Sequence, residues 1–321
     1  MHLLLLPVLV TDALAVDTSL GFAVDAVAGG GSTPSGAQTY AGLREVEGDL
    51  GVAAGAFRAR ANLEVGVATG GDSVTVTLLR AEHATVGVDT GSIVADVGVS
   101  VSPWRIESND PWQNALVTNF TGTRAVPAQI LGGAVSTGSR AVYLQAIAGS
   151  AYGGNGLDFS NGVPDGSRRV VGVFGAAGLG ARANSTRVVG GAWAYPGSGG
   201  DGGFQLGARM DVAVLAVQTE LVGTFDGALR AQVEAEALSR LPFTPVARVS
   251  WDEGPGIAMG ARIKPFPLVA LKAQGAYERE QFSGWVEAVV YTIPDPLHRR
   301  ERDDTHRKRT KKSDTRIPGG A

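Results

Sequence analysis

Charged and amide side chains occur in this chain in rows in which every second residue is polar. Arg230, Gln232, Glu234 and Glu236 form one such row, and apolar residues occupy the positions between them. On a strand, Glu234 and Glu236 would lie on one face about 7 Å apart. Two carboxylates at such a separation could serve a glycoside hydrolase. Because Arg230 and Gln232 continue the row, a charged lining of a water-filled space is the better interpretation.

Other catalytic or metal-binding chemistry has few candidates. The chain has no Cys and four His, of which only His83 is far from both ends. A single His excludes a His-based metal cluster, and the lack of Cys excludes thiolate sites. A Ser/His/carboxylate triad would depend on His83, whose neighbours in residues 80–84 form no nucleophile motif. We interpret His83 as a strand-end residue, and predict no enzyme, no catalytic residue, no metal and no cofactor.

The polar rows are one half of a two-residue periodicity that is typical of β-strands. In residues 57–68, apolar side chains at the odd positions alternate with Arg58, Arg60 and Glu64 at even positions. A strand sends the two sets to opposite faces, whereas a helix would spread the charges around its axis. The same pattern predicts strands in residues 20–26, 206–216, 229–237, 257–264 and 271–278.

Turn-forming residues separate these segments. Some connections are short, such as Gly70-Gly71-Asp72, and two are long, at residues 102–125 and 153–167. Short turns at one rim and long loops at the other are typical of outer-membrane barrels. At about 18–20 residues for each strand and its connection, residues 16–296 predict about 14 strands, in a range of about 12–16. Residues 168–195 alternate poorly and give the weakest signal.

A membrane barrel explains this alternation better than a soluble β-sandwich does. A sandwich domain has about 100 residues, and no boundary divides the chain into such units. Its apolar face is mostly Ala, Val and Leu, which suits contact with lipid better than the filling of a core. The predicted fold is therefore all-β, a transmembrane antiparallel up-and-down β-barrel. Aromatic residues near predicted turns would form interfacial girdles: Trp193, Tyr195, Trp251, Tyr277, Trp285 and Tyr291.

The charged face of each strand would line the lumen of such a barrel. Rings of charged side chains set the ion preference of pores, and the near balance of the two signs predicts weak selectivity. The predicted pore-lining residues are Arg58, Arg60, Glu64, Arg209, Asp211, Glu220, Arg230, Glu234, Arg248, Arg262 and Lys272.

The two ends differ from the body of the chain. Residues 1–15 hold a short apolar core followed by Ala13-Leu14-Ala15, the pattern of a signal-peptide cleavage site; a buried N-terminal strand is the alternative. Residues 297–321 carry nine Lys or Arg and four Asp or Glu, a net of +5, which leaves −8 of the total of −3 for the rest. We predict a signal peptide (1–15), an outer-membrane barrel (16–296) and a basic disordered tail (297–321), which either binds an acidic partner or is a gene-model artefact.

One segment resembles a known family. Residues 97–122 read VGVSVSPWRIESNDPWQNALVTNFTG, in which a strand runs into Pro103, Glu107 follows, and an Asn-rich loop with aromatic residues leads to Thr121-Gly122. This segment resembles the OmpL-like family of bacterial β-barrel porins. The resemblance implies a passive pore, with Pro103, Glu107, Asn109 and Thr121-Gly122 in an early loop near or inside the pore mouth.

The loop from Trp104 to Phe120 has two interpretations. It either folds inward as a constriction, for which Trp104, Glu107, Asn109 and Trp112 are the candidates, or it is an ordinary external loop.

The sequence as a whole predicts a porin of the bacterial outer membrane, a passive pore for small hydrophilic solutes or ions with a mixed-charge lumen. Expected partners are outer-membrane lipid, small hydrophilic solutes or ions, and further copies of the chain in a homo-oligomer. The acidic body argues against nucleic acid as a partner. The alternatives are a structural or adhesive barrel with a plugged lumen, and an exported soluble β-protein that binds glycans.

Overall fold

The computed structural model describes residues 16–33, 36–70, 73–101, 103–104, 116–117, 127, 129–139, 142–152, 168–178, 186–197, 201–212, 214–237, 243–266, 268–278 and 280–292. The predicted signal peptide and basic tail lie outside these residues, as do Glu107, Asn109 and Trp112. No helix in the described ranges is long and apolar enough to cross a membrane.

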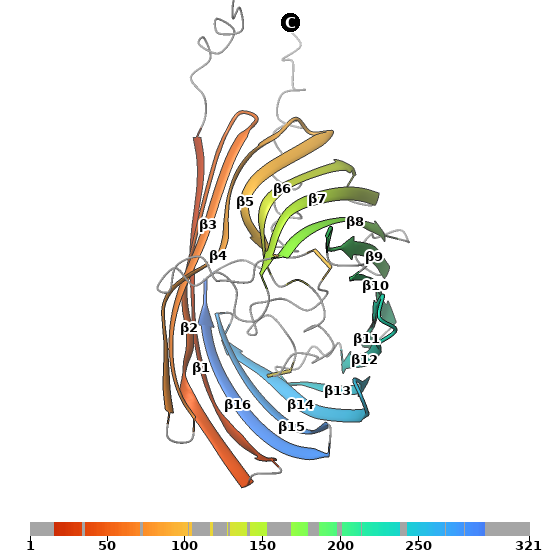
Figure 1. The fold of residues 1–321 in the computed structure, drawn as a ribbon. Helices are drawn as coiled ribbons and strands as arrows, with labels where there is room; N and C mark the ends of the chain where they lie inside the picture. The colour runs from red at the N-terminus through yellow and green to blue at the C-terminus, as the bar shows by residue number, and fades with distance from the viewer. Residues whose placement is uncertain are drawn as a thin grey trace, which may run out of the picture.

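Sixteen strands occur in the described part of the chain. Each pairs with its neighbours in sequence, all pairs are antiparallel, and β1 pairs with β16, so the sheet closes into a barrel (Figure 1). Closure leaves no free sheet edge, and it confirms the predicted antiparallel up-and-down barrel. The strands are β1 Val16–Thr33, β2 Gly36–Ala54, β3 Phe57–Gly70, β4 Ser73–Asp89, β5 Ile93–Val101, β6 Gln129–Gly138, β7 Val142–Tyr152, β8 Arg168–Gly178, β9 Thr186–Ala194, β10 Gly202–Val212, β11 Leu215–Thr224, β12 Leu229–Ala237, β13 Phe243–Trp251, β14 Pro255–Phe266, β15 Val269–Glu278 and β16 Gln281–Tyr291.

The two faces of the sheet have the reverse of the polarity of a soluble protein. On the outer face, Leu20, Val67 and Met259 are 81%, 45% and 61% exposed. On the inner face, Asp49 and Arg248 are 0% exposed. An apolar outer wall with a polar interior is the arrangement of a membrane barrel. The sandwich alternative is therefore wrong, because the aliphatic side chains are not enclosed between two sheets.

The strand count lies at the upper end of the predicted range. One segment that was predicted as a single strand forms parts of two strands. Residues 206–216 were expected to form a single strand, but β10 ends at Val212 and β11 begins at Leu215. Val212 and Leu215 pair with each other across a tight reversal. Apolar residues on both sides of this turn hide it in the sequence, and several such short turns explain why about 14 strands was an underestimate.

The connections give the barrel two different rims. The long β5–β6 and β7–β8 connections join odd to even strands, and therefore lie at the rim opposite the start of β1 and the end of β16; we call this the loop rim. The other rim, the turn rim, has tight turns such as those after β2 and β4. Gly55 and Gly91 in these turns have φ of 59° and 85°, in the left-handed region that glycine adopts without strain.

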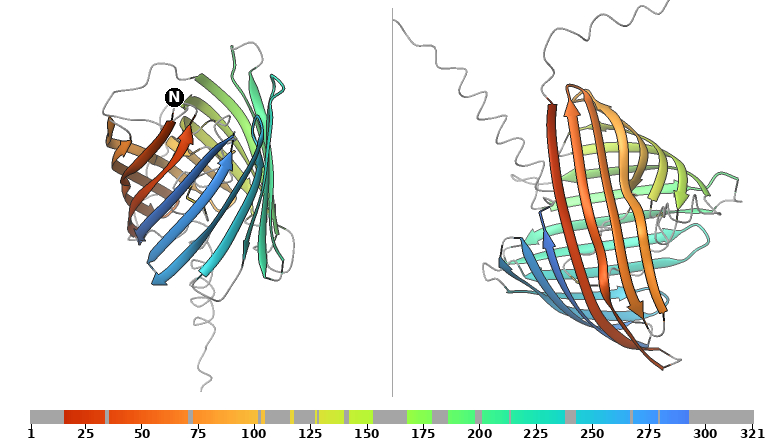
Figure 2. Two further views of the ribbon diagram at one scale, coloured as in Figure 1. Left: turned by 90° about the horizontal axis from the view of Figure 1, so that it is seen from below. Right: turned by 90° about the vertical axis from the view of Figure 1, so that its left-hand side faces the viewer.

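Strand length is also uneven around the barrel. β1, β2 and β4 have 18, 19 and 17 residues, whereas β9, β12 and β13 have nine each. The long strands stand together on one side, where they extend well past the shorter ones (Figure 2).

Outward-facing aromatic side chains lie near both rims. Phe57, Phe243 and Phe266 are exposed near the turn rim, and Trp251 and Phe282 are exposed near the loop rim. Aromatic belts at the two interfaces are typical of membrane barrels.

The residues predicted for these girdles were partly wrong. Trp251 and Tyr277 face outward, but Trp193 and Trp285 alternate with outward residues and belong to the inner face, and Tyr195 and Tyr291 pack against inner clusters. Closeness to a turn sets the height of a side chain in the barrel, whereas its face depends on its place in the alternation.

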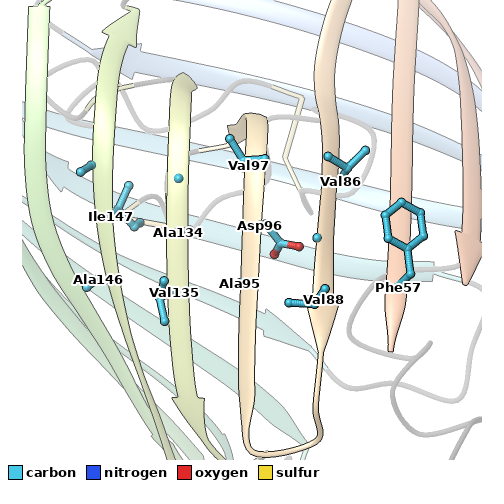
Figure 3. A pocket seen from close by; sticks show the side chains of 13 residues that line it. Phe57, Val86, Val88, Ala95, Asp96, Val97, Ala134, Val135, Ala146 and Ile147 are labelled. Atoms are coloured by element: carbon cyan, nitrogen blue, oxygen red, sulfur yellow. The ribbon is translucent and has the colours of Figure 1, made fainter. Parts of the chain in front are cut away.

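The outer wall carries an apolar groove of about 700 Å³ over β3 to β7 (Figure 3). Val86, Val88, Val97 and Val135 line it, with Phe57 at one end. All five side chains are exposed on the outer face, and Asp96, the partner of Arg58, also lies in the lining.

The seam between β1 and β16 closes the barrel. It pairs Ala23 to Gly31 with Tyr291 to Ser283. Gly29 leaves room for the ring of Trp285, since a Cβ at this position would collide with that ring. Tyr40 packs edge-on against Trp285, with ring centroids 6.0 Å apart.

Candidate pore lining

The predicted pore-lining residues all lie on the strand face that alternates with exposed aliphatic side chains. Their exposure differs widely. The side chains of Arg58 and Arg209 are 39% and 45% exposed, whereas those of Arg248 and Lys272 are fully buried. The structure places on this inner face Arg58, Arg60, Glu64, Arg209, Asp211, Glu220, Arg230, Glu234, Arg248, Arg262 and Lys272.

Four charged residues from four strands form a buried network at the seam. The Arg44 guanidinium contacts the Asp25 carboxylate at 2.7 Å and the Glu287 carboxylate at 2.8 Å, and the Lys272 ammonium contacts Glu287 at 2.8 Å. The side chains of Asp25, Glu287 and Lys272 are fully buried. Within these four residues two cations are paired with two carboxylates, which offsets the cost of burying each charge.

Only Lys272 of this network was predicted. Arg44 and Glu45 are adjacent in the sequence, which breaks the alternation of β2. The register of β2 shifts at this point against both β1 and β3, which marks a β-bulge. An extra residue in one strand re-aims the neighbouring side chains, and a bulge is not visible as a two-residue pattern.

A second group of ion pairs lies on β2 to β5. Arg60 contacts Asp49 at 2.8 Å, and Arg58 forms a close ion pair with Asp96. Glu64 lies directly opposite Glu47, and both are buried. The arginines of this group keep part of their surface accessible, so both can meet a solute in the lumen.

A third group extends from β10 to β15. Arg230 contacts Asp252 at 2.8 Å, Arg248 contacts Glu278 at 3.3 Å, and Arg262 forms a close ion pair with Glu236. Glu220 accepts a hydrogen bond of 3.0 Å from the amide of Gln232.

The two carboxylates first considered for hydrolysis belong to this group. Glu236 contacts Arg262, and Glu234 lies in register with Arg248. Arginines beside both carboxylates support the interpretation of Glu234 and Glu236 as part of a charged lining.

The inner wall of β6 to β9 is different, because most of it is apolar. Ile130, Ile147, Phe174, Val189 and Trp193 form one buried cluster on consecutive strands. Arg187, at the start of β9, lies outside this cluster on the same inner face.

Trp104, from the β5–β6 connection, covers this apolar sector. Its indole N–H donates a 2.9 Å hydrogen bond to the carbonyl of Val173, and its ring packs on Trp193 with centroids 5.7 Å apart. Gly172 and Gly191 make room, since a Cβ at either position would collide with the indole. Trp104 is fully buried, so this point of the connection lies inside the barrel.

A second point of the same connection contacts another sector of the inner wall. Leu116 packs with Val246, Ala258 and Ala276 of β13, β14 and β15. The backbone N–H of Val117 donates to Gln274 Oε1 at 2.7 Å, and its carbonyl accepts from Arg44 at 3.2 Å. The connection is therefore held at two separated places on the inner wall. Of the constriction candidates, Trp104 lies inside the barrel; Glu107, Asn109 and Trp112 are outside the described residues.

Sequence reasoning misplaced His83 and missed several inner residues. His83 lies within β4, half-buried, with a ring nitrogen 3.0 Å from the Thr85 hydroxyl, and not at a strand end. Arg187 and Trp193 were missed as lining residues because residues 168–195 alternate poorly. In the described residues, no group of three or more His, Asp or Glu side chains could hold a metal ion.

No protein-family model and no curated protein matches this sequence. The assignment to the OmpL-like family therefore remains a resemblance of residues 97–122.

Solved structures are similar over most of the chain. A loop-deletion mutant of OmpT, an outer membrane protein of Vibrio cholerae, has a TM-score of 0.58 at 10% identity, and the match covers 86% of this chain and 99% of that one. A mutant of the Rhodopseudomonas blastica porin has a TM-score of 0.56 at 8% identity, with coverages of 86% and 100%. The low-pH structure of Pseudomonas putida OprB has a TM-score of 0.55 at 8% identity, with coverages of 85% and 92%. At these identities the likeness shows the fold, which is that of bacterial outer-membrane porins.

Proposed function

We propose that the protein is a passive porin of the bacterial outer membrane, which conducts small hydrophilic solutes or ions through a mixed-charge lumen. The observation that carries the proposal is the polarity of the closed barrel. Exposed aliphatic side chains cover its outer face, and charged side chains such as Asp49 and Arg248 are buried on its inner face. A charged interior is useful to a barrel in lipid when the lumen handles water and polar solutes.

Weak ion selectivity is part of this proposal. Most inner arginines have a carboxylate partner, as Arg60 has Asp49 and Arg230 has Asp252. Paired charges of both signs give a field across the lumen and little net preference for one sign of ion. The protein would act without a cofactor and not as an enzyme.

The other sequence predictions enter the proposal unchanged. Residues 1–15 would direct export, the exposed aliphatic wall would contact outer-membrane lipid, and copies of the chain would form a homo-oligomer. Nucleic acid is not a proposed partner.

A second candidate, a structural barrel with a plugged lumen, is favoured by the two anchors of the β5–β6 connection. Trp104 and Leu116 are both fully packed against the inner wall, so these two points of the connection lie within the lumen. In a porin the same anchors would hold a constriction.

Conductance of the refolded chain in a planar bilayer distinguishes the two candidates. A porin gives discrete ohmic steps, whereas a plugged barrel gives none although it still shows heat-modifiable mobility on a gel. A chain that needs no detergent and shows no such mobility would contradict both candidates. It would instead favour an exported soluble β-protein that binds glycans.

A further inference from the structure

Two arginines lie directly opposite each other on the inner wall. Arg187 of β9 and Arg209 of β10 are partners in the strand register. Side chains at such positions have Cβ atoms about 4.5–5.5 Å apart, and like charges there destabilise a sheet. The pair therefore needs negative charge close by.

Arg209 has only distant carboxylate partners. Its nearest carboxylate contacts are 3.7 Å to Asp211 and 3.8 Å to Glu236, both long for an ion pair. Glu236 makes a closer ion pair with Arg262. The Arg209 side chain remains 45% exposed.

Arg187 has no carboxylate within ion-pair distance in the described residues. Its guanidinium donates a 3.2 Å hydrogen bond to the hydroxyl of Tyr143. The next residues along the cross-strand row beyond Arg209 are the uncharged Gln218 and then Glu234, which lies opposite Arg248. Two strand spacings separate Glu234 from Arg209, about 10 Å at the backbone.

We propose that Arg187 and Arg209, together with Tyr143, form a binding site for the carboxylate or phosphate group of a small solute. The site lies on the turn-rim side of the lumen, near the start of β9 and the end of β10. Guanidinium groups bind such oxyanions through two parallel N–H donors. The Tyr143 oxygen accepts from Arg187, and its own O–H, for which the described residues show no acceptor, can donate to the anion. This site rests on the proposed pore function, to which it adds a solute class.

The test measures block of chloride current through the refolded full-length chain. Sodium acetate and sodium phosphate are titrated separately against wild type and the Arg187→Gln/Arg209→Gln variant. The half-blocking concentration of at least one anion is expected to rise about tenfold in the variant, because charge-assisted hydrogen bonds are lost. A rise for acetate assigns the site to carboxylates, and a rise for phosphate assigns it to phosphates.

Arg169→Gln is the matched control, since Arg169 shares the outer face of β8 with the exposed Val171. It removes one positive charge outside the lumen and should leave the block unchanged. Arg187→Lys keeps the positive charge but lacks the two parallel N–H donors of a guanidinium, so its half-blocking concentration should be intermediate. If the double variant does not refold, the two single variants are measured in the same way.

Failures of the two proposals are distinguishable. Absence of wild-type channels would overturn the pore. Channels that acetate and phosphate block equally in wild type and variant, or not at all, would overturn the anion site and leave the pore in place.

Discussion

Between β6 and β9 the inner wall is mostly apolar, with Arg187 near the turn rim as an exception, whereas from β10 through the seam to β5 it carries ion pairs and amides. In the charged sector, cations and carboxylates from neighbouring strands neutralise each other, as Arg44 does with Asp25 and Glu287. The apolar sector is covered by Trp104, which comes from a connection and not from the sheet. The inner wall is thus stabilised in two ways: by ion pairs between strands in the charged sector, and by packing of a side chain from a connection in the apolar sector.

The two sectors also hold two separate points of the same connection, Trp104 near its start and Val117 near its middle. The indole of Trp104 fixes it at β8 and β9, and Arg44 with Gln274 fixes it at β2 and β15. Variants in each sector therefore test whether both are needed to position the connection.

The largest effect is expected from Trp104→Ala. Removal of a fully buried indole leaves a cavity in the apolar sector, which should lower the free energy of unfolding by about 3–5 kcal/mol. Release of the anchor should also raise single-channel conductance. Trp251→Ala, on the outer face, is the control and should leave conductance unchanged. Equal conductance of wild type and Trp104→Ala would show that Trp104 does not hold a constriction.

Arg44→Ala breaks the charged sector. It leaves Asp25 and Glu287 buried with only Lys272 as a cation, and it frees the carbonyl of Val117. The expected loss is again about 3–5 kcal/mol, as for one partner of a buried ion pair. It is measured from the urea unfolding midpoint in detergent. Arg168→Ala removes an exposed pair with Asp201 and should cost about 0–1 kcal/mol; similar losses in both variants would contradict the buried network.

Met259→Arg tests the outer face of the barrel, which is apolar behind both sectors of the inner wall. An arginine facing lipid near the middle of a barrel strand costs about 2–4 kcal/mol, whereas Met259→Leu should be nearly neutral. The comparison is made by refolding into lipid vesicles. An arginine tolerated as well as leucine would mean that this face does not contact hydrocarbon.

The clearest effect on ion selectivity is expected from Arg58→Glu combined with Arg60→Glu. Both side chains are partly accessible on the inner face, so reversal of their charge should shift ion preference toward cations. The reversal potential in a salt gradient measures this shift. An unchanged potential would reject a lumen-facing role for both residues.

The alternation of residues 57–68 and 229–237 was enough to predict strands, their faces and the barrel. These segments correspond to β3 and β12 almost residue for residue. A two-residue period is a local property of the chain, and the face that each side chain takes follows from it directly.

What could not be predicted depends on contacts between distant residues. The bulge at Arg44 and Glu45 obscured the seam network, and glycines in β8 and β9 obscured Arg187 and Trp193. The place of Trp104 depends on space left by Gly172 and Gly191, which are remote in sequence. No periodicity in the β5–β6 connection carries that information.

The seam has a consequence for the order of folding. Its partners, such as Ala23 and Tyr291, are nearly the whole chain apart in sequence, whereas every other strand pair joins neighbours in sequence. Contacts between such remote residues carry the greatest entropic cost before they form. The hairpins should therefore assemble first, and the docking of β1 on β16 under the Trp285 ring should be the late step that commits the chain to its final shape.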